Sequence, residues 1–334
     1  MPDLLPDEFR FAHEFAFFLH NRLVHILTRG EREDAYGVKI TLRSKTKATE
    51  FTNLSGEHLW KWLKENGHDQ SLRELAYKQV FAALLSDFSH FIFEALDCSR
   101  KGKLTVTYAL LRKPLRDNLH YLEWLLVDPE NFIDVFQGEV LPRMDLQRAK
   151  ALVEKSVARV PNHEMFDPEV IYRLRFESGH VGLDGICDQA LHLVTHRSDI
   201  ATEVGNFNFV FSNTEDNLNQ WRHIYFTVPY LLDYTVDLCE VLIASVMGQV
   251  LSDYPEIALR RFIGLIVWSQ DLATQPTEVV QALPQPRIQE MPLVCSKCSK
   301  PIEPQLEDLR RFFIAEYIKC PHCRRRLRLS DLSQ

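Results

Sequence analysis

Four cysteines near the end of the chain are the residues whose types and spacing say most about chemistry. They form two CxxC pairs with 21 residues between the pairs: Cys295, Cys298, Cys320 and Cys323. The tight turn inside a CxxC lets both sulfurs reach one ion, so two pairs can supply a complete tetrahedral metal site. Four thiolates leave no open position for water or substrate. The spacing therefore predicts one Zn²⁺ ion that is structural and not catalytic.

Two other kinds of site use similar cysteines. A thioredoxin-like redox CxxC belongs to a βαβ context, which the surrounding sequence lacks. A rubredoxin-like iron site has the same ligands, but zinc is the commoner occupant of such a set. His322 stands between two of the ligands, and we expect it to be a bystander because four sulfurs already fill the coordination sphere.

The residues between the two pairs allow two local structures. In the first, a short helix places Leu306, Leu309 and Phe313 on one face. In the second, a strand that contains Phe312 and Ile314 runs into the second pair. The pattern leaves open a two-stranded ribbon and a helix between two knuckles. In either case metal binding should supply most of the folding free energy of so small a unit.

A run of arginines follows the last cysteine: Arg324, Arg325, Arg326 and Arg328. From Glu290 to the end, nine Lys and Arg stand against six Asp and Glu, whereas the formal net charge of the whole chain is -7. A basic surface on a small zinc module can contact phosphates, so these arginines are candidates for binding nucleic acid or a protein partner. The alternative is an edge strand that its charge protects from pairing with other chains.

A second group of polar residues lies in helices that are otherwise apolar. Arg112, Arg116 and His120 are four residues apart in a predicted helix over residues 105–127, so they share one face. Buried charges must be paired, and one interpretation is a stripe of salt bridges between neighbouring helices. The other is a polar cleft in which arginine binds an anion and histidine moves a proton.

A further arginine and histidine are close in sequence: Arg175 near the end of a predicted helix, and His180 in a loop that contains glycines. Glycine lets backbone approach a ligand closely, which makes this loop a candidate site. Either Arg112, Arg116 and His120 or this second pair would suit a ribonuclease that uses no metal, in which arginine stabilises the charged phosphate and histidine transfers the proton. The chain contains neither HExxH nor GxSxG, which argues against a zinc protease and a serine hydrolase.

The stretch LLRKPLRDNLHYLEWLLVDPENF at residues 110–132, with ALHLVTH at 190–196, resembles segments of uncharacterised helical bacterial proteins. Some of those proteins are discussed beside HEPN-type helical domains, which occur in toxins and antiviral systems. The resemblance covers about a third of the chain. It implies a helical fold and a place in a bacterial defence system.

The resemblance also implies the HEPN ribonuclease motif, Arg-x4–6-His, usually with a polar residue after the arginine. Arg175 and His180 have the shortest of these spacings, but Phe176 follows the arginine. Arg116 and His120 are separated by only three residues. Neither pair matches the whole motif, so the resemblance supports the fold more than the activity.

The rest of the chain indicates what must position these residues. It has 334 residues, 46% of them hydrophobic and 25% charged, with only 12 glycines and neither GxGxxG nor GxxxxGK[ST]. This composition argues against glycine-rich nucleotide folds and favours helices with short connections. We therefore predict a mainly α fold: a multi-helix body over residues 1–272, a proline-rich linker over 273–292 and a zinc-ribbon-like module over 293–334.

Location and assembly follow from weaker features. The most apolar region, residues 225–250, contains three acidic residues and is predicted to be a core helix rather than a membrane span. No export signal is visible and the other three cysteines are expected to be free thiols, so we expect a cytoplasmic protein without a membrane partner. A homodimer is compatible with an apolar helical body. The main hypothesis is a protein that acts by binding through its C-terminal module; the alternatives are the metal-independent ribonuclease and a structural adaptor.

Overall fold

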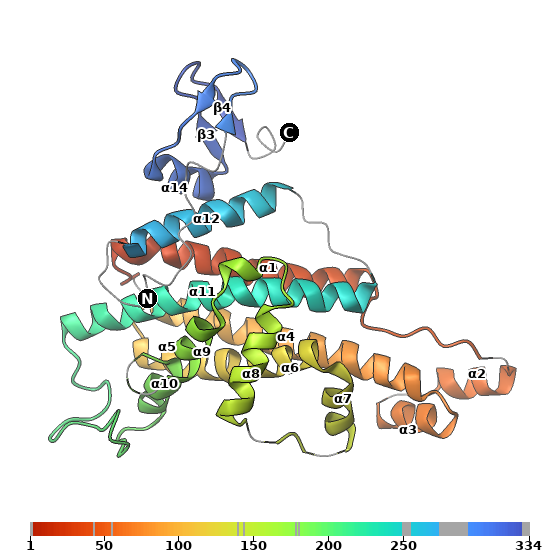
Figure 1. Cartoon of the computed structure of the whole chain (residues 1–334). Helices are drawn as coiled ribbons and strands as arrows, with labels where there is room; N and C mark the ends of the chain where they lie inside the picture. The colour runs from red at the N-terminus through yellow and green to blue at the C-terminus, as the bar shows by residue number, and fades with distance from the viewer. Residues whose placement is uncertain are drawn as a thin grey trace.

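Three long helices form the centre of the body. α1 (Arg10–Arg32), α4 (Asp69–Arg100) and α11 (Thr214–Met247) lie side by side, as Figure 1 shows, and apolar side chains fill the contacts between them. α11 is apolar on nearly all sides, and most of its side chains from Trp221 to Val246 are buried. A helix with this pattern belongs in an interior. The prediction of a mainly α fold is confirmed.

The computed structural model describes residues 3–42, 44–54, 56–138, 140–142, 144–177, 179, 181–248, 255–273 and 293–328. Shorter helices surround the three long ones: η1 (Asp7–Phe9), α2 (Lys45–Thr52), α3 (Glu57–Glu65), α5 (Leu104–Arg112), η2 (Lys113–Asn118), α6 (Leu119–Val127), α7 (Pro129–Gly138), α8 (Leu146–Val157), η3 (His163–Met165), α9 (Pro168–Phe176), α10 (Leu183–Leu191) and α12 (Pro255–Ala273). The predicted linker over residues 273–292 falls outside the described residues except at its first position.

Several helices begin at residues whose side chains cap them. Asp145 before α8, Asp167 before α9 and Asn213 before α11 each accept hydrogen bonds from backbone N–H groups of the following turn. The first N–H groups of a helix have no partner inside it, so these side chains fix where the helix starts.

A proline inside α11 explains one contact between buried helices. Pro229 has no N–H group, so the carbonyl of Tyr225, four residues earlier, lacks its usual helical partner. The indole N–H of Trp268 on α12 donates to that carbonyl at 2.9 Å. All three residues are buried, so α12 supplies the hydrogen bond that the proline removes from α11.

Acidic side chains on α11 are paired with arginines from other helices. Arg261 of α12 contacts Asp233 at 2.6 Å and also Asp237. Such pairs explain how charges are held in the most apolar part of the chain, because an unpaired buried carboxylate would cost several kcal/mol. Within the described residues, no helix combines the length and apolar character needed to cross a membrane.

The C-terminal module has the helix that the sequence allowed between the cysteine pairs, and the alternative strand through Phe312 and Ile314 is wrong, because both residues lie in that helix and the strand begins only at Tyr317. β1 (Leu293–Val294) pairs antiparallel with β2 (Pro301–Ile302), and β3 (Tyr317–Lys319) pairs antiparallel with β4 (Arg326–Arg328). The helix α14 (Leu306–Ala315) lies between these hairpins in the sequence. The module is therefore two short hairpins joined by one helix.

α14 packs against the body, on the side where α12 and α1 lie (Figure 1). The ring of Phe313 lies among three phenylalanines of α1, with centroids 5.2 Å from Phe11, 5.9 Å from Phe15 and 5.4 Å from Phe18. Gly264 of α12 permits this close approach, because a Cβ atom there would lie 2.7 Å from the Phe313 ring. A side chain from the module thus completes the core of the body.

Charged contacts border this apolar contact. Arg310 of α14 pairs with Asp271 of α12, and Arg260 of α12 pairs with Glu316 at the end of α14. The guanidinium of Arg260 also lies 5.0 Å from the centre of the Phe313 ring, a cation–π distance. These contacts hold the module in one orientation on the body.

Candidate metal centre and polar cavities

The four cysteines face one another between the two hairpins. The Sγ atoms of Cys295 and Cys323 are 3.6 Å apart, and those of Cys298 and Cys320 are 3.7 Å apart. A tetrahedral ion with sulfur ligands at about 2.3 Å has sulfur–sulfur edges of about 3.8 Å. A disulfide requires about 2.05 Å, so these thiols are unbonded and spaced for one metal ion. Within the described residues they form the only such cluster of His, Cys, Asp or Glu.

The two CxxC turns have the same backbone structure. In each, the N–H of the first cysteine donates to the carbonyl five residues later, at 3.0 Å for Cys295 and 2.9 Å for Cys320. The residue after each second cysteine has a positive φ, 54° for Ser299 and 60° for Arg324. This repeated turn directs both sulfurs of a pair to the same side, which explains how two short segments build one site.

His322 contributes no atom to the cysteine cluster. Its Nε2 lies 3.1 Å from the carbonyl oxygen of Pro301 in β2, on the other hairpin. The histidine therefore links the second CxxC turn to the first hairpin, beside the cysteines.

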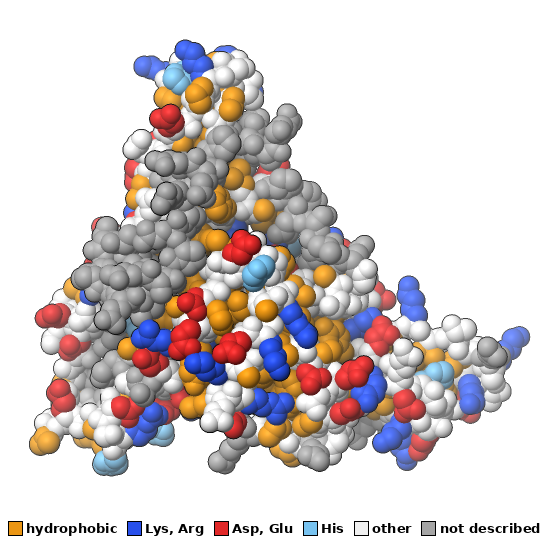
Figure 2. All heavy atoms as spheres, viewed as in Figure 1, with side chains coloured by type: hydrophobic (Ala, Val, Ile, Leu, Met, Phe, Trp, Pro, Cys, Tyr) orange, Lys and Arg blue, Asp and Glu red, His pale blue; other side chains and the backbone are white. Residues whose placement is uncertain are grey.

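Charge is separated along the module. Its hairpins and CxxC turns carry seven exposed basic residues, which we call the basic tip: Lys297, Lys300, Lys319, Arg324, Arg325, Arg326 and Arg328. The described hairpins and CxxC turns contain no acidic residue; Glu303 follows β2, and the other acids among the described residues of the module lie on α14 or directly after it. Figure 2 shows the Lys and Arg side chains gathered at the end of the module that points away from the body. All four arginines named from the sequence belong to this surface.

The second candidate site lies where the helix predicted over residues 105–127 is interrupted. That prediction is wrong in detail, because the π-helical turn η2 separates α5 from α6. Pro114 accounts for the interruption, since it has no N–H to donate within an α-helix. The N–H of Leu119 bonds instead to the carbonyl of Pro114, five residues earlier. π-helical turns are frequent at functional sites.

η2 forms one wall of a cavity of about 810 Å³, and α4 forms another. We call it the η2 cavity; its charged and strongly polar lining residues are Asp87, Arg112, Lys113, Arg116, Asp117, Asn118 and His120. Cavities of this size commonly bind small molecules. The structure thus brings Arg112, Arg116 and His120 to a single hollow.

One carboxylate of α4 organises the cavity wall. Lys113 and Asn118 both donate to Asp87, at 2.8 Å and 2.7 Å. Burial tends to raise the pKa of Asp87, but the hydrogen bonds from Asn118 and Lys113 outweigh it and hold the pKa below its ordinary value. Asp87 is therefore ionised at neutral pH and neutralises Lys113.

Carboxylates of α10 lie next to the two arginines of the cavity, Arg112 and Arg116. Arg112 donates to Asp188 at 3.3 Å. The Nε atom of Arg116 lies 2.6 Å from Asp184, although the two groups are not aligned for a hydrogen bond. A guanidinium has five N–H donors, so each arginine keeps donors for a further partner. The sequence allowed either salt bridges or a polar cleft at these residues, and the structure contains both.

His120 is buried without a hydrogen bond. The residue is 3% exposed, and its Nδ1 is fully enclosed with no partner among the described residues. Burial, together with the positive charges of Arg175, Arg148 and Arg116, lowers the pKa of His120 to about 3. The ring is therefore neutral at pH 7, where it is a weak base.

This lowered pKa predicts that acid destabilises the protein. An unfolded histidine has a pKa near 6.5, so below that pH the unfolded state binds a proton that the folded state does not bind until about pH 3. Stability is consequently lost as the pH falls through 6.5. From His120 alone, the free energy of unfolding should drop by about 2 kcal/mol between pH 7 and pH 5. Urea unfolding of the wild type and of His120→Asn at both pH values measures the effect.

His13 provides the comparison for this measurement. Burial is the main cause that lowers the pKa of His13 to about 4, and its Nδ1 lies 2.7 Å from the Tyr225 hydroxyl. His13→Asn should therefore remove a similar part of the acid sensitivity. Equal acid sensitivity in the wild type and both buried-site variants would contradict the assignment.

Arg175 lies behind the cavity wall and not in the hollow. Its fully buried guanidinium donates to Glu123 at 2.7 Å and to the carbonyls of Leu115 at 2.8 Å and Arg116 at 3.3 Å. Both carbonyls belong to η2, where the α-helical bonding is interrupted. Arg175 therefore stabilises the turn that carries Arg116. The histidine predicted to accompany it, His180, lies outside the described residues.

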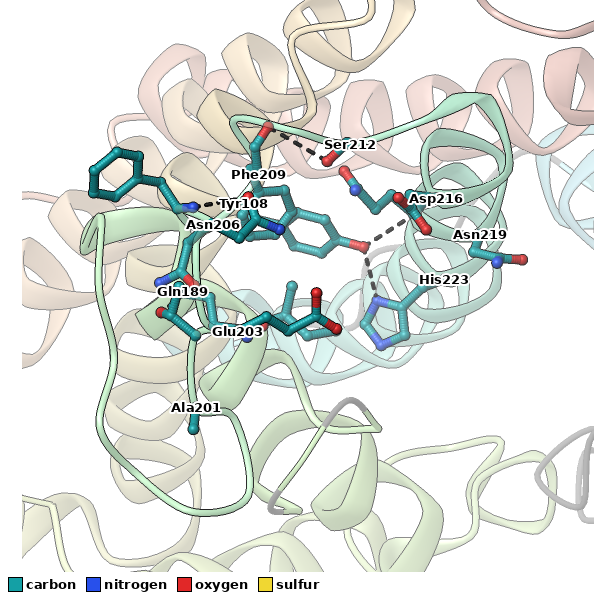
Figure 3. Close-up of a pocket in the computed structure, with 15 residues that line it drawn as sticks. Tyr108, Gln189, Ala201, Glu203, Asn206, Phe209, Ser212, Asp216, Asn219 and His223 are labelled. Atoms are coloured by element: carbon teal, nitrogen blue, oxygen red, sulfur yellow. Dashed lines mark hydrogen bonds between the residues drawn. The ribbon is translucent and has the colours of Figure 1, made fainter.

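A second hollow, of about 520 Å³, lies beside the long connection between α10 and α11. Figure 3 shows Tyr108 at its centre, with the hydroxyl 3.1 Å from both His223 Nδ1 and the carbonyl of Gln220. Among the described residues, no Lys or Arg lines it. Its amides serve the loop itself, as when Asn208 donates to the carbonyl of His192 at 2.7 Å. Neutral and acidic residues therefore line this pocket, and their hydrogen bonds hold the loop in place.

Sequence patterns did not identify Lys113, Asn118 or Tyr108 as residues that shape these hollows. For the first two, the proline at position 114 was the available indication, because a proline inside a helical pattern marks a disturbed turn. Tyr108 gave no indication, since an aromatic residue on a helix usually belongs to the core.

Comparison with known proteins found no match to this chain among protein-family models, curated proteins or solved structures. The functional argument therefore starts from the cysteine cluster, the basic tip and the η2 cavity.

Proposed function

We propose that this protein binds nucleic acid through the basic tip, and that a structural Zn²⁺ held by the four cysteines shapes that surface. The separation of charge within the module carries the proposal: seven exposed basic residues and no acidic residue occupy the described hairpins and CxxC turns. Clusters of Lys and Arg bind the phosphate backbone without reading sequence. Because the basic residues stand on the turns that surround the cysteines, metal binding would order the contact surface.

The charge of the remaining chain supports nucleic acid as the ligand of the tip. The whole protein has a formal net charge of -7, so the body is acidic although the module is basic. An acidic body repels phosphate, and the tip is then the surface where a polyanion can approach. An acidic protein partner is the competing outcome of the experiment below.

Replacing three arginines of the tip should weaken binding and its dependence on salt. Arg324→Gln, Arg325→Gln and Arg326→Gln together should lower the affinity for single-stranded RNA or duplex DNA by at least about tenfold at low salt. Each lost phosphate contact should also reduce the slope of log affinity against log salt by about 0.7 to 0.9. Fluorescence anisotropy between about 50 and 200 mM salt measures both quantities.

The control is a variant with the same change of charge at the other end of the molecule. Lys47→Gln, Lys61→Gln and Lys64→Gln remove three exposed cations from α2 and α3 and should leave binding unchanged. Metal content is measured in both variants, because the tip variant must keep its ion for the comparison to hold. Loss of affinity in the control alone, or no binding at low salt, would reject the proposal and favour a protein partner.

A ribonuclease is a second candidate, because Arg112, Arg116 and His120 line one cavity. The low pKa of His120 keeps its ring neutral at pH 7 and makes it a weak base there, which argues against this candidate. The RNA from the binding experiments can be analysed on denaturing gels. Products that disappear with His120→Ala and persist in the tip variant would support this candidate; intact RNA throughout would reject it.

A further inference from the structure

Unpaired polar atoms gather around the η2 cavity. Among the described residues, eight enclosed side-chain atoms lack an aligned hydrogen-bond partner, and four of them belong to residues that line this cavity or contact a lining residue: Arg112 Nε, Arg116 Nε, His120 Nδ1 and Asp184 Oδ1. Two of the four, Arg116 Nε and Asp184 Oδ1, lie 2.6 Å apart without the alignment of a hydrogen bond. Buried polar groups in folded proteins nearly always have partners, so a concentration of exceptions requires an explanation. A bound ligand is one such explanation.

The lining residues in this group are donors. Arg112 and Arg116 are permanently charged, and each makes one aligned hydrogen bond, to Asp188 and Asp117 respectively. The carboxylates thereby orient the guanidinium groups while leaving other N–H donors free. His120 has no hydrogen bond at all within the described part of the chain. The cavity therefore has hydrogen-bond donors that no protein group uses, and these donors favour a ligand rich in acceptor atoms.

The electric field at the cavity selects an anion among such ligands. Three arginines on three elements lower the pKa of His120 after burial itself: Arg175 on α9, Arg148 on α8 and Arg116 on η2. Arg175 is balanced by Glu123, but Arg148 has no carboxylate partner among the described residues and lies over the ring of Trp124 at 3.7 Å. The charged residues of the lining are three cations, Arg112, Lys113 and Arg116, and two carboxylates, Asp87 and Asp117. The net positive charge of this lining would attract an anion.

We propose that the η2 cavity binds a phosphate-bearing small molecule of about mononucleotide size, whose phosphate accepts hydrogen bonds from Arg112, Arg116 and His120. The planar guanidinium matches two phosphate oxygens at once, which a single positive point charge does not. The volume of about 810 Å³ suits a compact ligand. The proposal requires no bond cleavage and does not depend on the basic tip.

The test uses the full-length metal-loaded protein with three probes: inorganic phosphate, adenosine monophosphate and adenosine. Nuclear magnetic resonance of histidine side chains, with His120→Asn to assign the His120 signals, should show the first two probes shifting the His120 ring and adenosine leaving it unchanged. Calorimetry should show that Arg112→Gln and Arg116→Gln each weaken the binding of adenosine monophosphate by about tenfold or more.

Two controls separate this site from other causes of binding. Arg222→Gln changes an α11 arginine whose nearest partner is Asn219, and it should leave the affinity for adenosine monophosphate unchanged. The triple arginine variant of the basic tip should also keep this affinity, so failure of the nucleic-acid proposal would not affect the result.

Three results would overturn the inference. In the first, no phosphate probe shifts the His120 signals of the wild-type protein at about 10 mM. In the second, adenosine binds as tightly as its monophosphate; in the third, both arginine variants retain phosphate binding. Circular dichroism confirms that each variant is folded before its affinity is compared.

Discussion

Replacing Cys320 with serine should abolish metal binding and unfold the C-terminal module. Structural zinc contributes about 10–16 kcal/mol to the folding of small zinc units, and a module with two short hairpins has little else to replace it. Because α14 lies between the two cysteine pairs, its unfolding should also withdraw Phe313 from the phenylalanines of α1. Metal analysis should fall from one zinc per chain to none, and limited proteolysis should cut within residues 293–328.

Cys98→Ser provides the control, since Cys98 is a partly buried thiol far from the metal cluster in sequence and absent from it in space. It should keep its zinc and its resistance to protease. A Cys320→Ser protein that retains one zinc per chain would show that the four cysteines are not the ligand set. A wild-type protein that carries iron in place of zinc would leave the ligands intact and correct the metal.

Breaking the buried pair between Arg175 and Glu123 should be the most destabilising single change in the body. Both side chains are 0% exposed, and loss of one partner leaves an uncompensated charge in the interior. Arg175→Met or Glu123→Leu should each lower the free energy of unfolding by about 3–5 kcal/mol. The double variant should recover much of this loss, because apolar residues can replace a buried pair at little cost.

Urea unfolding of the two single variants and the double variant measures the coupling between these residues. A coupling below about 1 kcal/mol would contradict the assigned pair. The same proteins decide whether Arg175 has a chemical role. A structural Arg175 predicts that the double variant keeps both nucleic-acid and phosphate binding, whereas a catalytic Arg175 predicts lost RNA cleavage in a protein of normal stability.

The parts of this structure that sequence predicts are those set by local rules. A CxxC fixes its own turn, so the four cysteines could be assigned to one site without knowledge of the fold. The fold class follows from helical apolar patterns, and the start of α11 is also set locally, because the Asn213 side chain caps it within one turn. The residues that these rules place are the metal cluster and the long helices.

The parts that sequence does not predict depend on partners far along the chain. The sequence places Arg175 beside His180, but its ion-pair partner is Glu123, 52 positions away. The regular spacing of Arg112, Arg116 and His120 assumes an unbroken α-helix, and it does not predict the π-helical turn at Pro114 across which these three side chains line one cavity. Only the packing of α4 and α9 against this turn, with Asp87 and Arg175 as its supports, defines the hollow.

The contact between Phe313 and α1 also determines the order in which this protein can be completed. α1 leaves the ribosome before most of the chain exists, and at roughly 5–20 residues per second its phenylalanines wait on the order of tens of seconds for α14 to be made. On the proposed zinc site, the contact also requires that the cysteines bind an ion. In a cell short of zinc the contact would then not form, and chains with this apolar face uncovered would be substrates for chaperones and proteases. The cellular amount of the protein should therefore follow the supply of zinc.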